Sequence, residues 1–364
     1  MNNYRPFSLL IPFLLYASFS ITSIVALPID IAPKYSPQDV RILSVGDWGS
    51  ASLGGYHLKN AENTANAMKI YASEYKPKLV LNTGDNFYYC GIQNTSDPQV
   101  STDYVELFGD IGIPWYNALG NHDYGFNPDA QLGLNKTIPN WIMDNRYYHN
   151  RVILESGDNI NNDTSIVLNI IVLDTNPCVN DYRGKDRAKW DPCGVQYPTC
   201  APAQGECLFH ENIIAQDCTA QLNWFNNTLS NISSDEWVFV IGHHKADEIN
   251  TENFQTLLDS SRVHLYLNGH NHNLEHYSIN DQAKYMTTGA GGMVVIGANG
   301  DFNAKLHDDL LNKIHHKKND AKSIWNKIIT GFSSHTFFES GDKVKTDFLD
   351  VNQSILYSFT INKK

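Results

Sequence analysis

The chain has 364 residues, of which 42% are hydrophobic and 12% are aromatic, so it carries enough apolar material to bury a substantial core. Its formal net charge at pH 7 is -12. Because nucleic-acid phosphates are bound through an excess of Lys and Arg, this charge balance argues against a nucleic-acid partner.

The first 26 residues have the pattern of a signal peptide. Arg5 precedes an apolar stretch that begins at Phe7, and we expect cleavage near Ala26. An uncleaved membrane anchor is the alternative, although Pro12 and several hydroxyl residues weaken a spanning helix. The segment predicts a protein that is secreted or lysosomal/vacuolar, without stable membrane insertion after cleavage.

Short apolar runs alternate with segments of helical pattern after residue 40. We predict strands at 40–45, 79–82, 115–118, 166–173, 237–241 and 264–267. We predict helices at 57–73 and 220–229. Strands that alternate with helices are typical of layered α/β packing. Further strands are predicted at 284–288, 336–339, 343–349 and 355–361, and we expect them to form a second sheet that faces the first.

We interpret residues 36–364 as one catalytic domain that carries two insertions. The first insertion, at about 177–218, is rich in Cys, Pro and Gly. The second, at about 302–329, has helical periodicity and many charged residues. Its His315 and His316 fit an exposed helix face better than a metal site, because charged residues surround them.

The chain has six cysteines, and five of them crowd into the first insertion. These five are Cys178, Cys193, Cys200, Cys207 and Cys218. In a secreted protein they predict a loop stapled by disulfides. A zinc site that includes His210 is the alternative, and the sequence does not reveal which cysteines pair.

Six Asn-x-Ser/Thr sequons predict a glycoprotein, although an Asn-rich chain produces some sequons by chance. Their asparagines are Asn94, Asn135, Asn162, Asn226, Asn231 and Asn352. Sequons and paired cysteines together favour a route through the secretory pathway.

Five short strings place polar, metal-competent side chains after predicted strands. They are Gly46-Asp47-Trp48-Gly49, Gly84-Asp85-Asn86-Phe87-Tyr88, Gly120-Asn121-His122-Asp123, Gly242-His243-His244 and Gly269-His270-Asn271-His272. Ligands gather beyond the carboxyl ends of strands in open α/β sheets, and glycine lets each loop turn sharply near the centre. Each string alone is compatible with an ordinary turn, but their order and shared position predict one metal site.

In this order the five strings resemble the ligand motifs of the metallophosphoesterases. Tyr88, three residues after Asp85, narrows the resemblance to the purple acid phosphatases. The chain length and the spacing from Asp47 to His272 look most like the small, mammalian-type, tartrate-resistant branch. The resemblance covers roughly residues 40–300 and implies the metallophosphoesterase fold, an α/β four-layer αββα sandwich of two mixed sheets flanked by helices.

The resemblance also implies a binuclear centre of Fe(III) and a second divalent metal, which would be Fe, Zn or Mn. The Fe(III) ligands would be Asp47, Asp85, Tyr88 and His272, and the ligands of the divalent metal would be Asn121, His243 and His270, with Asp85 bridging. Donor chemistry agrees, because anionic carboxylate and phenolate oxygens suit trivalent iron, whereas imidazoles and an amide oxygen suit a divalent ion.

The implied activity is an acid phosphatase that hydrolyses phosphate monoesters, either small or carried by phosphoproteins, through attack of a metal-held hydroxide. His122 is expected to contact the phosphate and to protonate the leaving alkoxide. Asn121 and His244 are expected to bind substrate as well. Asp123 would orient His122 or a neighbouring ligand, unless it forms an ordinary loop hydrogen bond. We expect a monomer.

One departure from the small branch leaves two other functions open. That branch commonly places another substrate-side histidine shortly after the Gly-His motif, whereas residues 245–262 contain none. His244 or Lys245 is the candidate for this role. The alternatives are a phosphodiesterase or nucleotide pyrophosphatase on the same scaffold, whose ester class depends on the pocket walls, and a non-catalytic iron- or phosphate-binding protein.

Overall fold

The computed structural model describes residues 39–154, 165–184, 191–193, 200, 205–294 and 321–363. Three predictions fall outside these residues, namely the signal peptide, the sequon at Asn162 and the first part of the helical insertion, residues 302–320. Among the residues described, no helix is both long and apolar enough to cross a bilayer.

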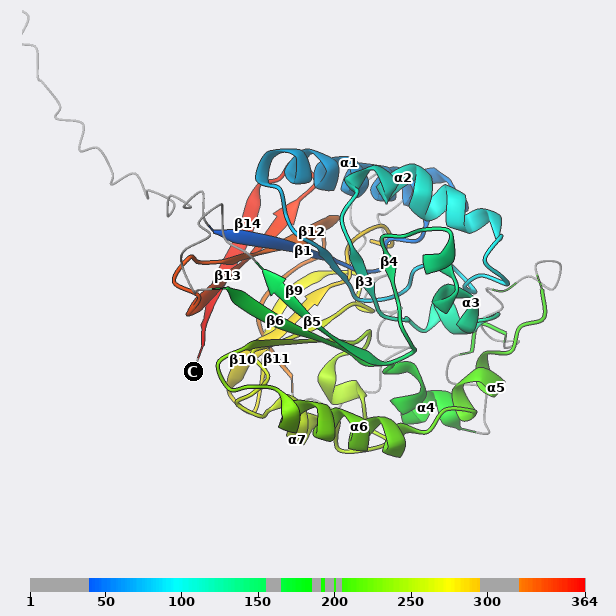
Figure 1. The fold of residues 1–364 in the computed structure, drawn as a ribbon. Coiled ribbons are helices and arrows are strands. Elements are labelled where there is room, and N and C mark those ends of the chain that lie inside the picture. The colour runs from blue at the N-terminus through cyan, green and yellow to red at the C-terminus, as the bar shows by residue number, and fades with distance from the viewer. Residues whose placement is uncertain are drawn as a thin grey trace, which may run out of the picture. The chain divides into compact units, whose positions relative to one another are not determined.

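Two seven-stranded mixed sheets organise the part of the chain that is described (Figure 1). The first sheet has the order β14-β13-β12-β1-β2-β3-β4. Its strands are β1 (Val40–Val45), β2 (Val80–Asn82), β3 (Trp115–Asn117), β4 (Trp141–Ile142), β12 (Gly331–Phe337), β13 (Lys343–Asp350) and β14 (Ile355–Asn362). The second sheet has the order β11-β9-β10-β8-β7-β6-β5. Its strands are β5 (Tyr148–Leu154), β6 (Ile166–Val172), β7 (Trp237–Ile241), β8 (Leu265–Asn268), β9 (Leu274–Ile279), β10 (Gln282–Thr288) and β11 (Lys322–Lys327).

Helices flank the two sheets on their outer faces, with α1 and α2 beside the first sheet and α4 to α7 beside the second (Figure 1). The helices are α1 (Gly55–Tyr75), α2 (Glu106–Phe108), α3 (Asp129–Leu132), α4 (Asn180–Arg183), α5 (Phe209–Ile214), α6 (Cys218–Asn231) and α7 (Phe254–Leu258). The predicted four-layer αββα sandwich of two mixed sheets is therefore confirmed.

The two predicted helices are both present and are slightly longer than predicted. α1 ends where Lys76 takes a left-handed conformation with φ of 50° and is followed by Pro77, which cannot continue a helix. α6 begins at an N-cap, because the Asp217 side chain accepts a hydrogen bond from the Ala220 N–H and so satisfies one of the helix's unpaired donors.

Each sheet contains a run of neighbouring parallel strands, and several of these strands are buried along their whole length. β1, β2 and β3 are parallel neighbours in the first sheet, and β6, β7 and β8 are parallel neighbours in the second. Every residue of β1, β2, β7 and β8 is buried, as expected for strands with covered faces. Parallel neighbours also bring their carboxyl ends to the same edge of the sheet.

The expectation that the C-terminal strands form a sheet of their own is wrong. β12 pairs antiparallel with β1, and β13 and β14 continue outward from it, so these three strands extend the first sheet. β10 instead pairs with β8 in the second sheet. Strand pairing over such sequence distances depends on tertiary packing, which the local apolar pattern does not report.

The predicted helical insertion is wrong for its last part, because Lys322–Lys327 forms strand β11 rather than a helix. β11 pairs antiparallel with β9. Its Trp325 ring stacks on Tyr357, with ring centroids 5.0 Å apart and planes at 7°. Pairing and aromatic packing at the sheet edge outweigh the local helical pattern.

All six cysteines belong to the described residues and form disulfides. Cys178–Cys218 and Cys193–Cys207 close the cysteine-rich insertion on itself, while Cys90–Cys200 ties the insertion to the loop after β2. The stapled loop is therefore confirmed, and the alternative of a zinc site is wrong because no thiolate is left to bind a metal.

Strand β12 starts before the predicted strand at 336–339, because its polar residues are buried with partners. His335 is fully buried. Its Nε2 lies 2.9 Å from Ser44 Oγ on β1, and its Nδ1 lies 2.9 Å from Thr346 Oγ1 on β13. Burial lowers the pKa of His335 to about 3, so the folded protein holds this imidazole neutral between two hydroxyls.

His335 predicts a loss of stability in acid. The unfolded chain binds a proton at this histidine near pH 6.5, whereas the folded chain does so only near pH 3, so the free energy of unfolding falls as the pH drops between these values. From pH 7 to pH 5 we expect His335 to contribute a fall of about 2 kcal/mol. We measure the free energy of unfolding in urea at pH 7 and at pH 5. Its fall between the two pH values should be about 2 kcal/mol smaller in His335→Gln than in the unmodified protein.

The control is His210→Gln, which changes a histidine that is only partly buried. The pH-dependent fall in the free energy of unfolding should change less in this variant than in His335→Gln. Equal falls in free energy of unfolding for His335→Gln and the unmodified protein would contradict the prediction.

Candidate metal centre

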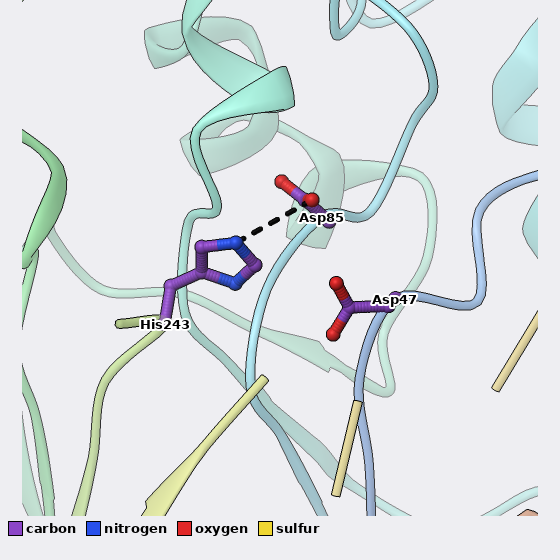
Figure 2. Close-up of side chains that lie close together, drawn as sticks. All are labelled: Asp47, Asp85 and His243. Carbon is purple, nitrogen blue, oxygen red and sulfur yellow. Dashed lines mark ion pairs between the residues drawn. The ribbon is translucent and has the colours of Figure 1, made fainter. Parts of the chain in front are cut away.

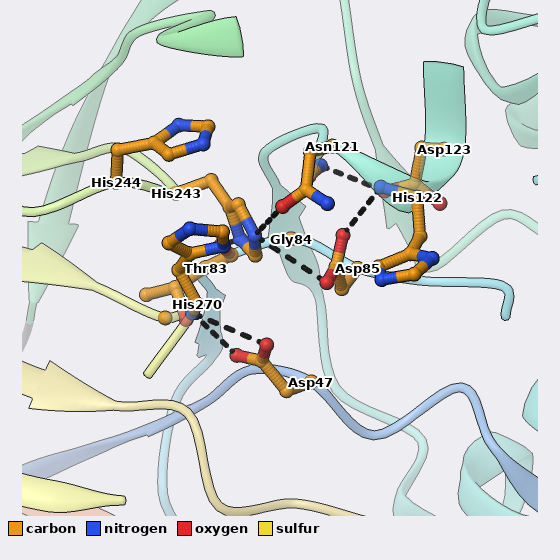
Figure 3. A network of polar contacts seen from close by, with 12 residues as sticks. Asp47, Thr83, Gly84, Asp85, Asn121, His122, Asp123, His243, His244 and His270 are labelled. Atoms are coloured by element: carbon orange, nitrogen blue, oxygen red, sulfur yellow. Dashed lines mark hydrogen bonds and ion pairs between the residues drawn. The ribbon is translucent and has the colours of Figure 1, made fainter. Parts of the chain in front are cut away.

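The five sequence strings meet in one place because they follow parallel strands of both sheets. Asp47 follows β1, Asp85 and Tyr88 follow β2, and Asn121 follows β3. His243 follows β7, and His270 and His272 follow β8. The structure brings all seven predicted metal ligands together. Figure 3 shows five of them, namely Asp47, Asp85, Asn121, His243 and His270.

Backbone conformation and glycine make this convergence possible. Asp47, Asp85, His270 and His272 all have left-handed backbones, with φ of 55°, 55°, 72° and 50°, which is uncommon for residues other than glycine and concentrates at functional sites. At Gly120 an added Cβ would lie 2.1 Å from Asp85 Oδ1. The carboxylate therefore occupies space that any side chain at that position would need.

The first group of side chains contains two carboxylates, a phenol and an imidazole. The Tyr88 hydroxyl lies 2.7 Å from Asp85 Oδ2 and 3.1 Å from Asp47 Oδ1. It also lies 3.3 Å from His272 Nε2, which is 3.4 Å from Asp47 Oδ1. Asp47, Asp85 and Tyr88 are at most 2% exposed.

The second group adjoins the first through Asp85. His243 Nε2 lies 2.9 Å from Asn121 Oδ1 and 3.4 Å from Asp85 Oδ2. The ring of His270 packs against His243 with centroids 5.0 Å apart. Figure 2 shows how Asp47, Asp85 and His243 face one another, and one ligand atom from each lies within 4.8 Å of the others.

The electrostatics of the two groups fit a cation. Burial and the adjacent carboxylates of Asp47 and Asp85 raise the pKa of Tyr88 well above its ordinary value. Burial lowers the pKa of His243, but the negative charges of Asp85 and Asp47 outweigh it and raise the pKa to about 9. Concentrated negative charge in a buried space is stabilised by bound metal ions, so this donor set fits the predicted centre.

Orientation of His243 fits a ligand role as well. Its Nδ1 lies 2.9 Å from the carbonyl oxygen of Thr83, to which it donates a hydrogen bond. Nε2 is then the nitrogen directed at Asn121 and Asp85. Histidine ligands are commonly held in this way through their second ring nitrogen.

Comparison with known proteins identifies the family. A family model described as calcineurin-like phosphoesterase matches residues 40–274, which is more than half of the chain. The chain belongs to the calcineurin-like phosphoesterases. The predicted resemblance to the metallophosphoesterases is thereby confirmed.

Relatives within this phosphoesterase family include several acid phosphatases. The chain is 27% identical to mouse (Mus musculus) tartrate-resistant acid phosphatase type 5, over 70% of this chain and 73% of that protein. It is 28% identical to purple acid phosphatase 3 of Arabidopsis thaliana, over 75% and 68% of the two chains. Similarity to purple acid phosphatase 17 of the same plant extends over 96% and 92% at 25% identity. These relatives confirm the resemblance to purple acid phosphatases.

Solved structures confirm the fold of this phosphoesterase. GAP50, the anchor in the inner membrane complex of Plasmodium, superposes with a TM-score of 0.62 at 20% identity and covers 90% of this chain and 89% of its own. A dimetal phosphatase from Danio rerio superposes with a TM-score of 0.51 at 12% identity, over 89% and 99% of the two chains.

His122 lies at the edge of the two groups and is partly buried. Its backbone N–H donates to Asp85 Oδ1 at 2.9 Å, and its Nδ1 lies 2.7 Å from the carbonyl oxygen of Tyr89. Its ring centroid is 4.5 Å from that of Tyr88. The structure therefore brings the predicted catalytic histidine next to the predicted ligands.

The surroundings of His244 in the structure argue against its predicted substrate contact. His244 is 1% exposed. Its Nδ1 lies 2.9 Å from Thr175 Oγ1 and its Nε2 lies 3.0 Å from the Tyr182 hydroxyl. With both ring nitrogens engaged by protein hydroxyls, the imidazole has no polar atom to offer a phosphate.

Thr175 and Tyr182 were missed from sequence, although one signal pointed to Thr175. The string Leu173-Asp174-Thr175 follows strand β6, as the five ligand strings follow their strands. Tyr182 lies in the cysteine-rich insertion, where no strand end or motif marks it. Contacts between separated segments of this kind appear only in the folded chain.

Asp123 organises the two loops from β2 and β3 instead of orienting the His122 ring. Its buried carboxylate accepts hydrogen bonds from the backbone N–H groups of Asn86, Phe87 and Gly120, at 3.0, 3.1 and 2.7 Å. The side chain of Gln131 donates a further bond at 2.8 Å. The alternative of loop hydrogen bonds is therefore the one that the structure shows.

Replacement of Asp123 should destabilise the protein strongly. In Asp123→Ala, three buried backbone donors and one side-chain donor lose their acceptor, and each unsatisfied donor is costly. We expect a loss of roughly 3 to 5 kcal/mol in the free energy of unfolding, measured by urea denaturation, because each buried donor left unsatisfied costs about 1 to 3 kcal/mol. Asp110→Ala, which removes an exposed carboxylate 3.5 Å from Lys69, should change stability by less than about 0.5 kcal/mol. Similar losses in the two variants would refute the assigned role.

Proposed function

We propose that the protein is an acid phosphatase of the purple type, which hydrolyses phosphate monoesters at a binuclear Fe(III)-M(II) centre. The observation that supports this most directly is the position of Tyr88, whose hydroxyl lies between the carboxylates of Asp47 and Asp85. A phenol in that position becomes a phenolate ligand when a trivalent cation takes the place of its proton.

We assign seven side chains to the two metals. Fe(III) would be held by Asp47, Asp85, Tyr88 and His272, and the divalent Fe, Zn or Mn ion by Asn121, His243 and His270, with Asp85 shared. The assignment rests on the contacts, since the first group and the pair Asn121–His243 each form short polar contacts. His270 joins the pair by packing its ring against His243. When bound, such a centre supplies Lewis-acid stabilisation of a phosphoryl group and a nucleophilic water at low pH.

The chain's own residues then bind the ester and move protons. We assign His122 to phosphate contact and to proton donation to the leaving oxygen, and Asn121 to the substrate side of the divalent ion. The His122 ring is held by a hydrogen bond from its Nδ1 to the backbone carbonyl oxygen of Tyr89. Nε2 of His122 is therefore the atom that we assign to proton transfer. Free phosphate should compete with substrate for the same positive centre.

The two candidates for a second proton donor, His244 and Lys245, both have other partners in the part of the chain that the structure describes. His244 is engaged by two hydroxyls. Lys245 forms an ion pair with Glu275 at 2.7 Å and lies over the ring of Tyr277. Both candidates for the missing histidine are therefore bound elsewhere, and His122 is the donor that the proposal relies on.

Phosphodiester hydrolysis is the rival activity. We expect p-nitrophenyl phosphate to be hydrolysed at least roughly tenfold faster, in kcat/KM, than bis(p-nitrophenyl) phosphate at acid pH, a difference of about 1.4 kcal/mol in the barrier. A faster reaction with the bis-ester would instead support a phosphodiesterase or nucleotide pyrophosphatase. Full metal occupancy with no turnover of either ester would support the non-catalytic binding protein.

The identity of the trivalent metal can be read from a visible spectrum. A phenolate bound to Fe(III) should give a charge-transfer band that makes the protein purple, and Tyr88→Phe should abolish it while Tyr89→Phe keeps it. A band that survives in Tyr88→Phe would refute the ligand assignment. A colourless protein with two zinc ions would refute the proposed Fe(III) site.

We also propose that the protein enters the secretory pathway and is glycosylated. Three disulfides fit an oxidising compartment. The sequon asparagines that are described are all exposed, namely Asn94, Asn135, Asn226, Asn231 and Asn352. We infer a glycoprotein that is secreted or lysosomal/vacuolar and monomeric, with small phosphate monoesters or phosphoproteins as substrates.

A further inference from the structure

His244 stands behind the proposed ligands of the divalent metal. Its ring centroid lies 4.4 Å from that of His270 and 5.1 Å from that of His243. Figure 3 shows the three imidazoles side by side, with His244 on the side away from Asp85 and Asp47. The ring therefore packs against the two imidazoles assigned to the divalent ion.

The hydrogen bonds of Thr175 determine the tautomer of His244. Thr175 Oγ1 accepts the backbone N–H groups of His243 and His244, at 3.1 and 3.2 Å. A hydroxyl oxygen has two lone pairs and one hydrogen, so the hydrogen of Thr175 is the one directed at His244 Nδ1, 2.9 Å away. His244 is then neutral, and its hydrogen is on Nε2.

Tyr182 completes the arrangement from the cysteine-rich insertion. Its hydroxyl oxygen lies 3.0 Å from His244 Nε2 and accepts the hydrogen carried there. Tyr182 is 5% exposed, so loss of this oxygen would leave the Nε2–H buried without that acceptor. The hydroxyl of Tyr182 therefore fixes the plane of the imidazole from the side opposite to Thr175.

A disulfide and hydrogen bonds hold the segment of Tyr182 in place. The disulfide Cys178–Cys218 joins the start of its segment to α6. The neighbouring Arg183 donates from Nη1 to the carbonyl oxygens of Pro177, Ile213 and Gln216, at 3.1 to 3.2 Å. The position of the tyrosine is thus set by contacts that are independent of the metal centre.

We propose that His244, held by Thr175 and Tyr182, is a positioning residue that orients His243 and His270 for the divalent metal ion. The proposal rests on the proposed function, because it takes these two imidazoles as ligands of one ion. It assigns to the cysteine-rich insertion a part in metal binding, through the single hydroxyl of Tyr182. Outer partners that hydrogen-bond metal ligands commonly change metal affinity by 10- to 100-fold, and we adopt this range for a partner that orients the ligands by ring packing.

The test compares Tyr182→Phe and His244→Phe with a matched control. Tyr357→Phe also removes a hydroxyl that lies 3.0 Å from a histidine nitrogen, Nδ1 of His276, but it acts on β14, outside the centre. Each protein is loaded with Fe(III) and Zn(II), and zinc dissociation constants are measured by competition with a chelator. The visible Fe(III) band and the melting temperature are recorded for the same samples.

We expect zinc to bind roughly 10- to 100-fold more weakly in Tyr182→Phe and His244→Phe, with the Fe(III) band retained and Tyr357→Phe unchanged. Unchanged zinc affinity in both site variants would overturn the inference. Joint loss of zinc and of the Fe(III) band, with a lowered melting temperature, would also overturn the inference. Such a result would show that His244 and Tyr182 support the fold in general. Failure of the unmodified protein to bind two metals would instead refute the proposed function.

Discussion

Two buried carboxylates that share one small space with a buried phenol are the constraint on which this structure depends. The Tyr88 hydroxyl lies within hydrogen-bonding distance of the carboxylates of Asp47 and Asp85, and all three groups are buried, so water screens the two carboxylate charges poorly. Burial of like charges is unfavourable unless cations compensate it. A metal-binding role accounts for the loops that hold these groups and for the imidazoles that face them.

Each half of the centre has its own supporting group. On the first sheet, Asp123 gathers the backbone donors of the loops after β2 and β3 and so fixes Asp85 and Asn121. On the second sheet, Thr175 binds the loop after β7 through two backbone N–H groups. Both supports are buried side chains that act on backbone, which gives ligand positions more precision than mobile loops would allow.

Local sequence pattern predicted the elements that are continuous and strongly apolar. Strand 40–45 and strand 237–241 have the predicted bounds, since their residues are buried on both faces. Strands that form only because other strands pair with them were not predicted, or were predicted with wrong bounds. β12 carries Ser, His and Thr that are buried because β1 and β13 supply hydrogen bonds, and β11 is a strand because β9 pairs with it.

The sequence by itself determined the family resemblance, the order of the ligand strings and the seven side chains that come together, because each follows a strand whose apolar pattern is local. Only the tertiary structure decided that the strings come from two different sheets, which cysteines pair with which and that β12 to β14 extend the first sheet. It also decided the role of His244, which depends on hydroxyls from residues 175 and 182. Side-chain partners distant in sequence meet through packing, and no local pattern records that packing.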